Sequence, residues 1–368
     1  MAPVSTSELE RHQQEPLPAA QQQPLRRRAA ATALPAGRAA LAAPLVATVA
    51  MALAALATRS AGLPLRDPGG VTVRRLTVAA ALVAGLLVLD LVVRAAWARR
   101  DGHPFVRALR EVCRVRWTPA RVAVVAVALV SFHVTYLAYR NIKSVAPLLR
   151  PGDLFDRQLF DIDRWLLGGQ DPYAALHDLL GMGSAGHVLS FVYMLFFAVI
   201  PVTLAVGLVL LPDLRAGLFV ATALSLTWLL GAGSYLLLPS IGPFHFDAAS
   251  FAGMPHTPVH DLQASLLEKR AAFLADPSAP GAAQSIGAFA SLHTAIWGTI
   301  VLVAHLLGVP RALRALIWAL ALLTVVATVY FGWHYTLDDV AGVVIALLAV
   351  GLAALLTGLR PARGRKRT

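Results

Sequence analysis

The residues best suited to chemistry are His334 and Asp338, four positions apart in Gly-Trp-His-Tyr-Thr-Leu-Asp-Asp-Val-Ala-Gly, where an apolar run begins. Side chains at this spacing share one face of a helix. A carboxylate bonded to one imidazole nitrogen fixes the tautomer, directs the other nitrogen outward and stabilises the cationic ring. A histidine held in this way can attack phosphorus, and a helix N-terminus favours the anion that it would attack. The pair is weak support alone, but it predicts phosphoryl transfer.

A second candidate segment is Phe-Ala-Ser-Leu-His-Thr-Ala, residues 289–295, which also opens an apolar run. Ser291 and the N–H groups around it could hold phosphate oxygens, and His293 could protonate a leaving oxygen as a general acid. The alternative is an interfacial histidine that only bonds a neighbour. A third segment, Leu-Pro-Ser-Ile-Gly-Pro-Phe-His, ends at His245 after a Gly-Pro turn. His245 could contact substrate or serve only the turn.

The composition places these segments in a membrane protein. Apolar residues occupy 57% of 368 positions and charged residues only 14%, and the mean hydropathy is +0.65. Ordinary globular chains carry about 25% charged residues, so lipid must cover part of this chain. A net charge of +12 would suit nucleic acid, but Lys and Arg lie mostly at the ends of apolar runs, where they orient spans and attract anionic head groups. Nucleic-acid binding is therefore rejected.

Eight apolar runs approach the roughly 20 residues that a helix needs to cross a bilayer. The expected fold class is therefore all-α, a polytopic membrane helical bundle of about eight transmembrane helices. The expected spans are 39–57, 76–98, 120–139, 187–211, 216–238, 291–307, 312–331 and 337–358. The first is expected to remain as a helix rather than to be cleaved as a secretory signal.

The distribution of Lys and Arg predicts how the spans are oriented. The hairpin 332–336 holds neither residue type, and the connection 239–290 holds only Lys269 and Arg270. Cytoplasmic loops carry an excess of Lys and Arg, so both termini are expected in the cytoplasm and the candidate histidines at the external membrane boundary. The first external loop does not fit this pattern, because it carries four arginines. They are Arg59, Arg66, Arg74 and Arg75.

On this topology the long connections 140–186 and 239–290 both face outward. Residues 153–165 and about 260–275 are expected to form amphipathic helices in the membrane interface. Five aspartates of the first connection could bind a divalent metal, but a solvated helix face is the favoured interpretation. They are Asp153, Asp156, Asp161, Asp163 and Asp171.

Together, the three candidate segments resemble the type 2 phosphatidic acid phosphatase superfamily. Its second signature is Pro-Ser-Gly-His and its third closes on His-x-x-x-Asp, which Ser291-Leu292-His293 and the His334–Asp338 segment fit. The Ser-Leu-His and His-Tyr forms look closest to the inositolphosphotransferase branch, which is similar to inositol phosphorylceramide synthase. The resemblance implies that His334 is the nucleophile, His293 the general acid and Asp338 the orienting carboxylate.

The chain also departs from the family pattern. Ala290 replaces the usual proline before Ser291, and the arginine that many members place before the nucleophile is missing from 328–333. The first signature, Lys-x(6)-Arg-Pro, is absent from 238–245, so another cation has to neutralise phosphate.

Residues 143–151 do spell Lys-x(6)-Arg-Pro, one helix pair too early in the chain. On the predicted topology they follow the third helix on the external side. Arg140, Lys143 or Arg150 could therefore reach the substrate, or all three could be ordinary interfacial side chains whose charged ends reach water.

The resemblance covers about residues 120–358 and divides the chain into four regions. They are a disordered cytoplasmic tail at 1–38, two additional transmembrane helices at 39–98, a six-helix phosphatase-like core at 120–358 and a basic cytoplasmic tail at 359–368.

The leading hypothesis is a multi-pass plasma-membrane enzyme that acts on a lipid phosphate or phospholipid through a phosphohistidine, with its site on the extracytoplasmic face. It would need no metal or cofactor, and it would act as an inositolphosphotransferase-like transferase or a lipid phosphatase. A catalytically inactive scaffold is the alternative that the missing arginines favour. A transporter would suit Asp90 and His133 within spans, but we find no internal repeat. The oligomeric state stays open.

Overall fold

The computed structural model describes residues 37–100 and 104–359. The part of the chain that it describes is all-helical, and the two predicted terminal tails lie almost wholly outside it. Seven of its helices are long and apolar enough to cross a membrane. They are α3 (Arg38–Ser60), α4 (Val71–Arg100), α6 (Pro119–Leu149), α9 (Ser184–Val209), α10 (Leu214–Leu237), α14 (Arg311–Tyr330) and α15 (Thr336–Thr357). The expected polytopic helical membrane bundle is thus confirmed.

The eighth expected span, 291–307, forms a shorter helix. It is α13, Leu292–Leu306, with 15 residues. At 1.5 Å per residue such a helix is about 22 Å long, which is less than the roughly 30 Å thickness of a hydrocarbon layer. The segment before it, 283–291, is not helical, and it lies at the same end of the bundle as the start of α15.

The helix α10 is the centre of the bundle. It packs against α3, α6, α9, α13 and α15, and 83% of its most apolar window is buried. Small residues permit this close packing: a Cβ atom on Gly217 would collide with the carbonyl oxygen of Gly207 on α9. A helix that is apolar on all sides belongs in the interior of a bundle.

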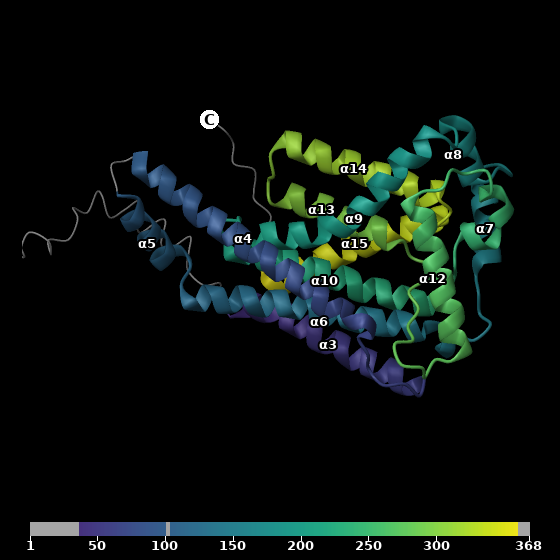
Figure 1. Cartoon of the computed structure of the whole chain (residues 1–368), viewed down its shortest axis with the longest axis horizontal. Helices are drawn as coiled ribbons and strands as arrows, with labels where there is room; N and C mark the ends of the chain where they lie inside the picture. Colours follow the sequence, from purple (N-terminus) through teal and green to yellow (C-terminus); the bar gives the residue numbers. More distant parts are fainter. Residues whose placement is uncertain (1–36, 101–103, 360–368) are drawn as a thin grey trace, which may run out of the picture.

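The first two spans are packed onto this bundle. The helix α3 lies along α6 and also touches α10, whereas α4 crosses α6 and α9 (Figure 1). The 3₁₀ turn η1 (Pro68–Gly70) leads from α3 into α4. At the end of the molecule far from η1, α4 packs against the short helix α5 (Phe105–Arg116).

Short helices cover the opposite end of the bundle, which we call the site end (Figure 1). They are α7 (Asp156–Leu166), α8 (Pro172–Leu180), α11 (Pro243–Phe246), η2 (Ala248–Phe251) and α12 (Pro258–Ala275). The expected helices at 153–165 and about 260–275 correspond to α7 and α12. The starts of α13 and α15 lie beneath them.

Two polar residues that the sequence places inside spans, Asp90 and His133, are bonded locally. Asp90 of α4 accepts from Arg94 and Arg116, each over 2.8 Å, and from the indole N–H of Trp117 over 3.2 Å. His133 of α6 bonds the carbonyl of Leu129 through Nδ1. Polar groups at membrane depth are usually paired in this way. The contacts of Asp90 and His133 are therefore explained by packing of the bundle.

Candidate active site

His334 lies in the tight turn between α14 and α15, and the start of α15 holds it. Asp338, in the first turn of α15, accepts from the N–H of Tyr335 over 3.0 Å. Its Oδ2 also lies 3.3 Å from Nδ1 of His334. Both side chains are buried, and Asp338 is 0% exposed. The spacing of four residues thus brings carboxylate and imidazole together, as the sequence predicts.

The second candidate histidine lies beside the first. His293, the second residue of α13, has its ring centroid 6.1 Å from that of His334. Its ring stacks on Tyr193 at 4.3 Å and contacts Phe196 at 4.0 Å, which fixes its orientation. Within the described residues Nε2 of His293 has no hydrogen-bond partner. Two motifs 41 positions apart in the sequence therefore form one imidazole pair.

Ser291 lies at a helix start, as the sequence predicts, but its side chain is turned to the helix itself. It is the N-cap of α13, and its hydroxyl accepts from the N–H of Thr294 over 3.3 Å. The side chain is completely buried, and it does not line the cavity that His293 and His334 share. Its contribution is to begin α13 at the correct residue, as serine caps do.

Asp339 is a buried neighbour that sequence reasoning missed. It accepts from the hydroxyl of Thr294, and the hydroxyl of Thr328 lies 3.3 Å from its Oδ2. It therefore joins α13, α14 and α15 directly behind the histidines. The Asp-Asp doublet was visible in the sequence, but only the first aspartate has the helical spacing to His334.

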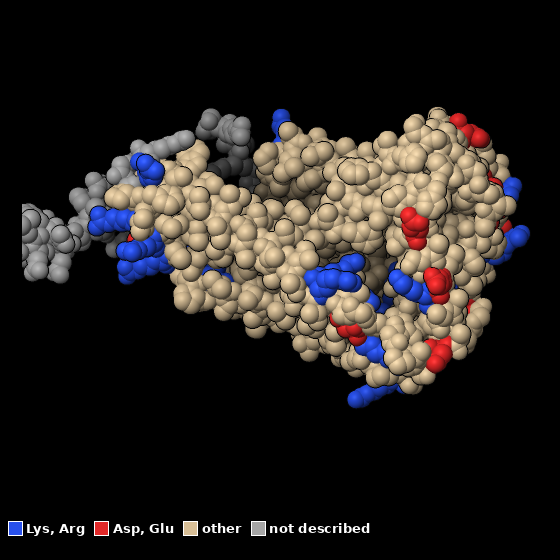
Figure 2. Space-filling view, in the orientation of Figure 1, with Lys and Arg blue, Asp and Glu red and all other residues tan. Residues whose placement is uncertain are grey.

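The two histidines line a cavity of about 510 Å³. Figure 2 shows a hollow on this face beside α12, with basic side chains on both sides of it. Apolar and aromatic groups make up much of the wall, as is usual for small-molecule sites. The aromatic residues are Tyr136, Tyr139, Tyr193, Phe196, Phe197, Trp228, Tyr235 and Trp333. Four cations also line it: Arg75, Arg140, Lys143 and Lys269.

Lys143 is the most buried of these cations, at 9% exposure. Its Nζ lies 3.3 Å from the hydroxyl of Tyr139 and 4.3 Å from the ring centroid of Tyr235. Within the described part of the chain it has no carboxylate partner. A buried ammonium without a counter-ion is costly, so this position is suited to an anionic ligand.

The electrostatic surroundings keep His334 neutral. Burial lowers the pKa of His334 to about 4, with Lys143 acting in the same direction, whereas Asp339 opposes the shift. A neutral imidazole has a free lone pair on one nitrogen, which is the form that a nucleophile needs.

The remaining predicted residues are divided between this cavity and other places. Arg140 lines the cavity, but its charge is paired with Asp67 over 2.6 Å. Arg150 lies outside it, bonded to Asp153 and to the carbonyl of Leu236, and lines a neighbouring cavity of about 340 Å³.

His245 is exposed and does not line the cavity of the two histidines. The segment that contains it contacts the site through the main chain: the N–H of Phe244 donates to the carbonyl of Gly332 over 2.8 Å. The segment therefore supports the turn that carries His334. A Cβ atom on Gly242 would lie 2.6 Å from the carbonyl oxygen of Trp333, so this close approach requires glycine.

The prediction that the aspartates of the first connection lie on a solvated helix face is wrong for two aspartates of α7. Asp156 is 5% exposed and Asp163 3%. Asp156 accepts from the N–H groups of Ile241 and Gly242 and from the hydroxyl of Tyr335, and Asp163 accepts from Thr336 N–H. Both carboxylates thus brace the start of α15. Among the residues that the structure describes, no three His, Cys, Asp or Glu side chains gather as metal ligands would.

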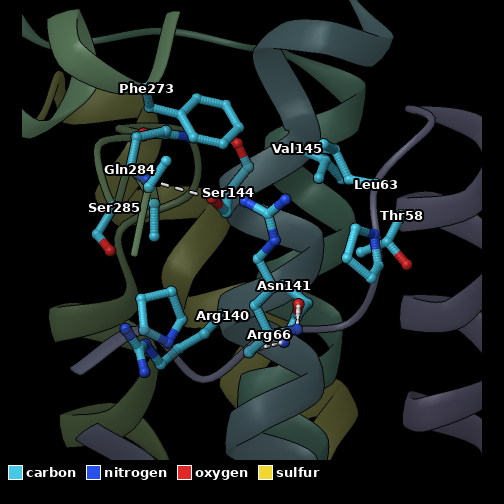
Figure 3. A pocket seen from close by; sticks show the side chains of 14 residues that line it. Thr58, Leu63, Arg66, Arg140, Asn141, Ser144, Val145, Phe273, Gln284 and Ser285 are labelled. Atoms are coloured by element: carbon cyan, nitrogen blue, oxygen red, sulfur yellow. Dashed lines mark hydrogen bonds between the residues drawn. The ribbon is translucent and has the colours of Figure 1, made fainter. Parts of the chain in front are cut away.

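The arginines that did not fit the orientation pattern lie at the site end. Arg66 extends into a small pocket between α6 and the segment that precedes α13 (Figure 3). Its guanidinium donates to the carbonyl of Pro277 over 2.9 Å. The backbone N–H of Arg66 donates to the side-chain oxygen of Asn141 on α6. The side-chain amide of Asn141 donates in turn to the carbonyl of Arg66. The link between α3 and α4 is thus fastened to two sides of the site.

Comparison with known proteins identifies a family. A model of the PAP2 superfamily matches residues 157–352, more than half of the chain. The matched region contains both histidines and Asp338, but neither Lys143 nor the first two spans. No curated protein and no solved structure matches the chain.

Proposed function

The chain belongs to the PAP2 superfamily, and from this premise we propose that it is a membrane enzyme transferring a phosphoryl group from lipid-linked phosphate through a phosphohistidine on His334. The observation that carries the proposal is the imidazole pair, with ring centroids 6.1 Å apart on one cavity. The unpaired ammonium of Lys143 on the same cavity supports an anionic substrate. The aromatic wall supports a substrate with an apolar part.

In the proposed reaction, the free nitrogen of neutral His334 attacks phosphorus while the bond from phosphorus to the leaving oxygen breaks. His293, in its protonated form, donates a proton to that oxygen and becomes neutral. Asp338 accepts a hydrogen bond from Nδ1–H of His334 and so stabilises the positive charge of the phosphorylated ring. In the second half, His293 takes a proton from the acceptor hydroxyl, whose oxygen attacks phosphorus and releases His334.

The acceptor decides the reaction class. Water as acceptor gives a lipid phosphatase. An inositol-like hydroxyl gives a transferase, as the Ser-Leu-His and His-Tyr forms of the two signatures suggest. Because the deep cation Lys143 precedes the region that the family model matches, we propose that residues 120–358, from α6 to α15, together form the catalytic core.

We also propose that the site opens to the extracytoplasmic side of the plasma membrane. The positive-inside rule supports this, since the hairpin 332–336 that carries His334 has no Lys or Arg. Two of the four arginines around the α3–α4 link have other contacts, because Arg66 bonds a loop carbonyl and Arg75 lines the cavity.

The test is turnover by the purified protein in detergent, beside His334→Ala. Substrates are a panel of lipid phosphates and phosphatidylinositol, with and without free inositol. Phosphate release that depends on His334 supports a phosphatase, and a new phospholipid without free phosphate supports a transferase. Turnover that survives His334→Ala contradicts the proposed nucleophile. A wild-type protein that is silent across the panel contradicts the enzyme proposal and favours an inactive scaffold.

A further inference from the structure

One wall of the cavity comes from a helix that the family match does not include. Arg75, in the second turn of α4, lines the cavity together with His293 and His334. Its guanidinium carbon lies 4.7 Å from the ring centroid of Tyr136 and 5.8 Å from that of Phe197. A guanidinium stacked on aromatic rings keeps its N–H donors free for a ligand in the plane of the group.

Among the described residues, no carboxylate neutralises the charge of Arg75. Across residues 37–100 and 104–359, its guanidinium has no ion pair and no hydrogen bond, in contrast to Arg140, whose charge Asp67 neutralises over 2.6 Å. Lys143, deeper in the cavity, donates to the hydroxyl of Tyr139 but has no carboxylate partner among the described residues. The cavity therefore combines a deep ammonium with a half-buried guanidinium, and both are available to an anion.

The start of α4 is held rigidly enough to position Arg75. Asp67 accepts from the N–H and the hydroxyl of Thr72 and so caps the first turn of α4. The same carboxylate binds Arg140 on α6. Arg66 ties the preceding link to the segment 277–279. These contacts fix the first turn of α4 relative to the cavity, and Arg75 lies three residues beyond Thr72.

We propose that Arg75 binds the non-reacting oxygens of the substrate phosphate. The helix pair α3–α4 thereby supplies the cation that the chain lacks at 328–333. This inference rests on the proposed function for the identity of the substrate, a lipid phosphate. The binding of phosphate to Arg75 is itself measurable without turnover. A planar guanidinium offers two parallel N–H donors to one phosphate group, which an ammonium does not.

The neighbouring Arg74 provides a matched control. It is exposed and does not line the cavity, yet it carries the same charge at the adjacent position of α4. Substitution of Arg74 therefore changes the general attraction to anions and anionic lipids by the same amount. Only a specific contact separates the two arginines.

The experiment measures binding of inorganic phosphate to the purified full-length protein in detergent, from the rise in melting temperature with phosphate concentration. The variants are Arg75→Gln, Arg75→Lys, Arg75→Met and Arg74→Gln. We expect Arg75→Gln and Arg75→Met to weaken phosphate binding roughly 10- to 100-fold, the range for a hydrogen bond to a charged group. Arg75→Lys should show an intermediate loss, because it keeps the charge without the two-donor geometry. Arg74→Gln should stay within about twofold of the wild type.

Two neutral variants protect the test against misfolding. Arg75→Met keeps an apolar stem against Tyr136 and Phe197. The test is valid if either neutral variant has a wild-type melting temperature in phosphate-free buffer. Wild-type phosphate affinity in that variant, an equal loss in Arg74→Gln, or no phosphate binding by the wild type would overturn the inference. Arg75-dependent binding by a protein without turnover would uphold it and contradict the proposed function instead.

Discussion

The backbone N–H of Ser291 donates to the carbonyl oxygen of Asp338 over 2.9 Å, which joins the start of α13 directly to the start of α15. The helix that carries His293 and the helix whose start holds His334 are therefore joined by main chain at the level of the imidazoles. Close approach continues one turn further along α15, at Gly342. A Cβ atom there would lie 2.6 Å from the carbonyl oxygen of Ser291 and 3.0 Å from Cβ of Thr294.

Gly342→Ala should therefore move the two histidines apart. Overpacking at such a contact costs about 1–3 kcal/mol of stability, and a displacement of about 1 Å between reacting groups reduces turnover by about 10²-fold. The measurements are the melting temperature and kcat/KM of the purified variant.

Gly351 is the matched control on the same helix, because a Cβ atom added there would meet nothing within 4 Å. Gly351→Ala should stabilise the helix by about 0.5–1 kcal/mol and leave turnover unchanged. Wild-type kinetics in Gly342→Ala would show that the spacing of α13 and α15 does not limit the reaction.

His334→Ala should abolish turnover, by roughly 10⁴-fold or more, as removal of a nucleophile does in other enzymes with a covalent intermediate. His245→Ala should leave turnover close to wild type, since His245 is exposed and outside the cavity. The rates are measured in one assay, with the melting temperature as a check on folding. A large loss in His245→Ala would restore His245 to the substrate site.

The low pKa of His334 predicts how stability depends on pH. Because burial lowers the pKa to about 4 from its ordinary value of 6.5, the unfolded chain binds the proton more readily than the folded one between these values. Stability is therefore complete above about pH 6.5 and falls as the pH drops toward 4. The loss attributable to this group is roughly 2–3 kcal/mol.

The measurement is the melting temperature of wild type and His334→Gln from pH 7.5 to 4.5. Glutamine does not titrate, so the variant should lose less stability than the wild type across this window. Parallel curves for the two proteins would mean that His334 titrates near its ordinary value.

Part of the site can be predicted from the sequence because helix geometry converts spacing into proximity. His334 and Asp338 meet because they are four residues apart at a helix start. The apolar runs predict the long helices, since length and composition alone decide whether a helix crosses a bilayer. His293 and His334 both follow loops at the same end of the bundle. The sequence predicts this, because successive spans cross the membrane in opposite directions.

The rest depends on which helices pack side by side, and no local pattern encodes that. Arg75 reaches the cavity only because α4 packs on α6 and α9, and its sole signal was an excess of arginine in a loop expected to lack it. Lys143 and Arg150 share a motif, yet only Lys143 lines the cavity, because Arg150 follows the last turn of α6 and pairs with Asp153. A charge run in sequence also does not distinguish an exposed aspartate from a buried one.

The contrast between two aspartates of α7 gives the last prediction. Asp156 is buried and satisfies the N–H groups of Ile241 and Gly242 as well as the hydroxyl of Tyr335, whereas Asp161 is exposed and pairs only with Arg157. Asp156→Ala leaves three buried donors without a partner, at about 1–3 kcal/mol each before relaxation or water entry. We expect a total loss of about 3 kcal/mol.

Asp161→Ala removes the same charge from the same helix, and we expect a change within about 0.5 kcal/mol, as for other exposed ion pairs. Both are measured as melting temperatures beside the wild type. Because the Tyr335 hydroxyl and Ile241 support the turn that carries His334, Asp156→Ala should also lower kcat/KM while Asp161→Ala does not. Equal stability of the two variants would show that α7 does not brace the site, and the buried carboxylate would then have no structural consequence.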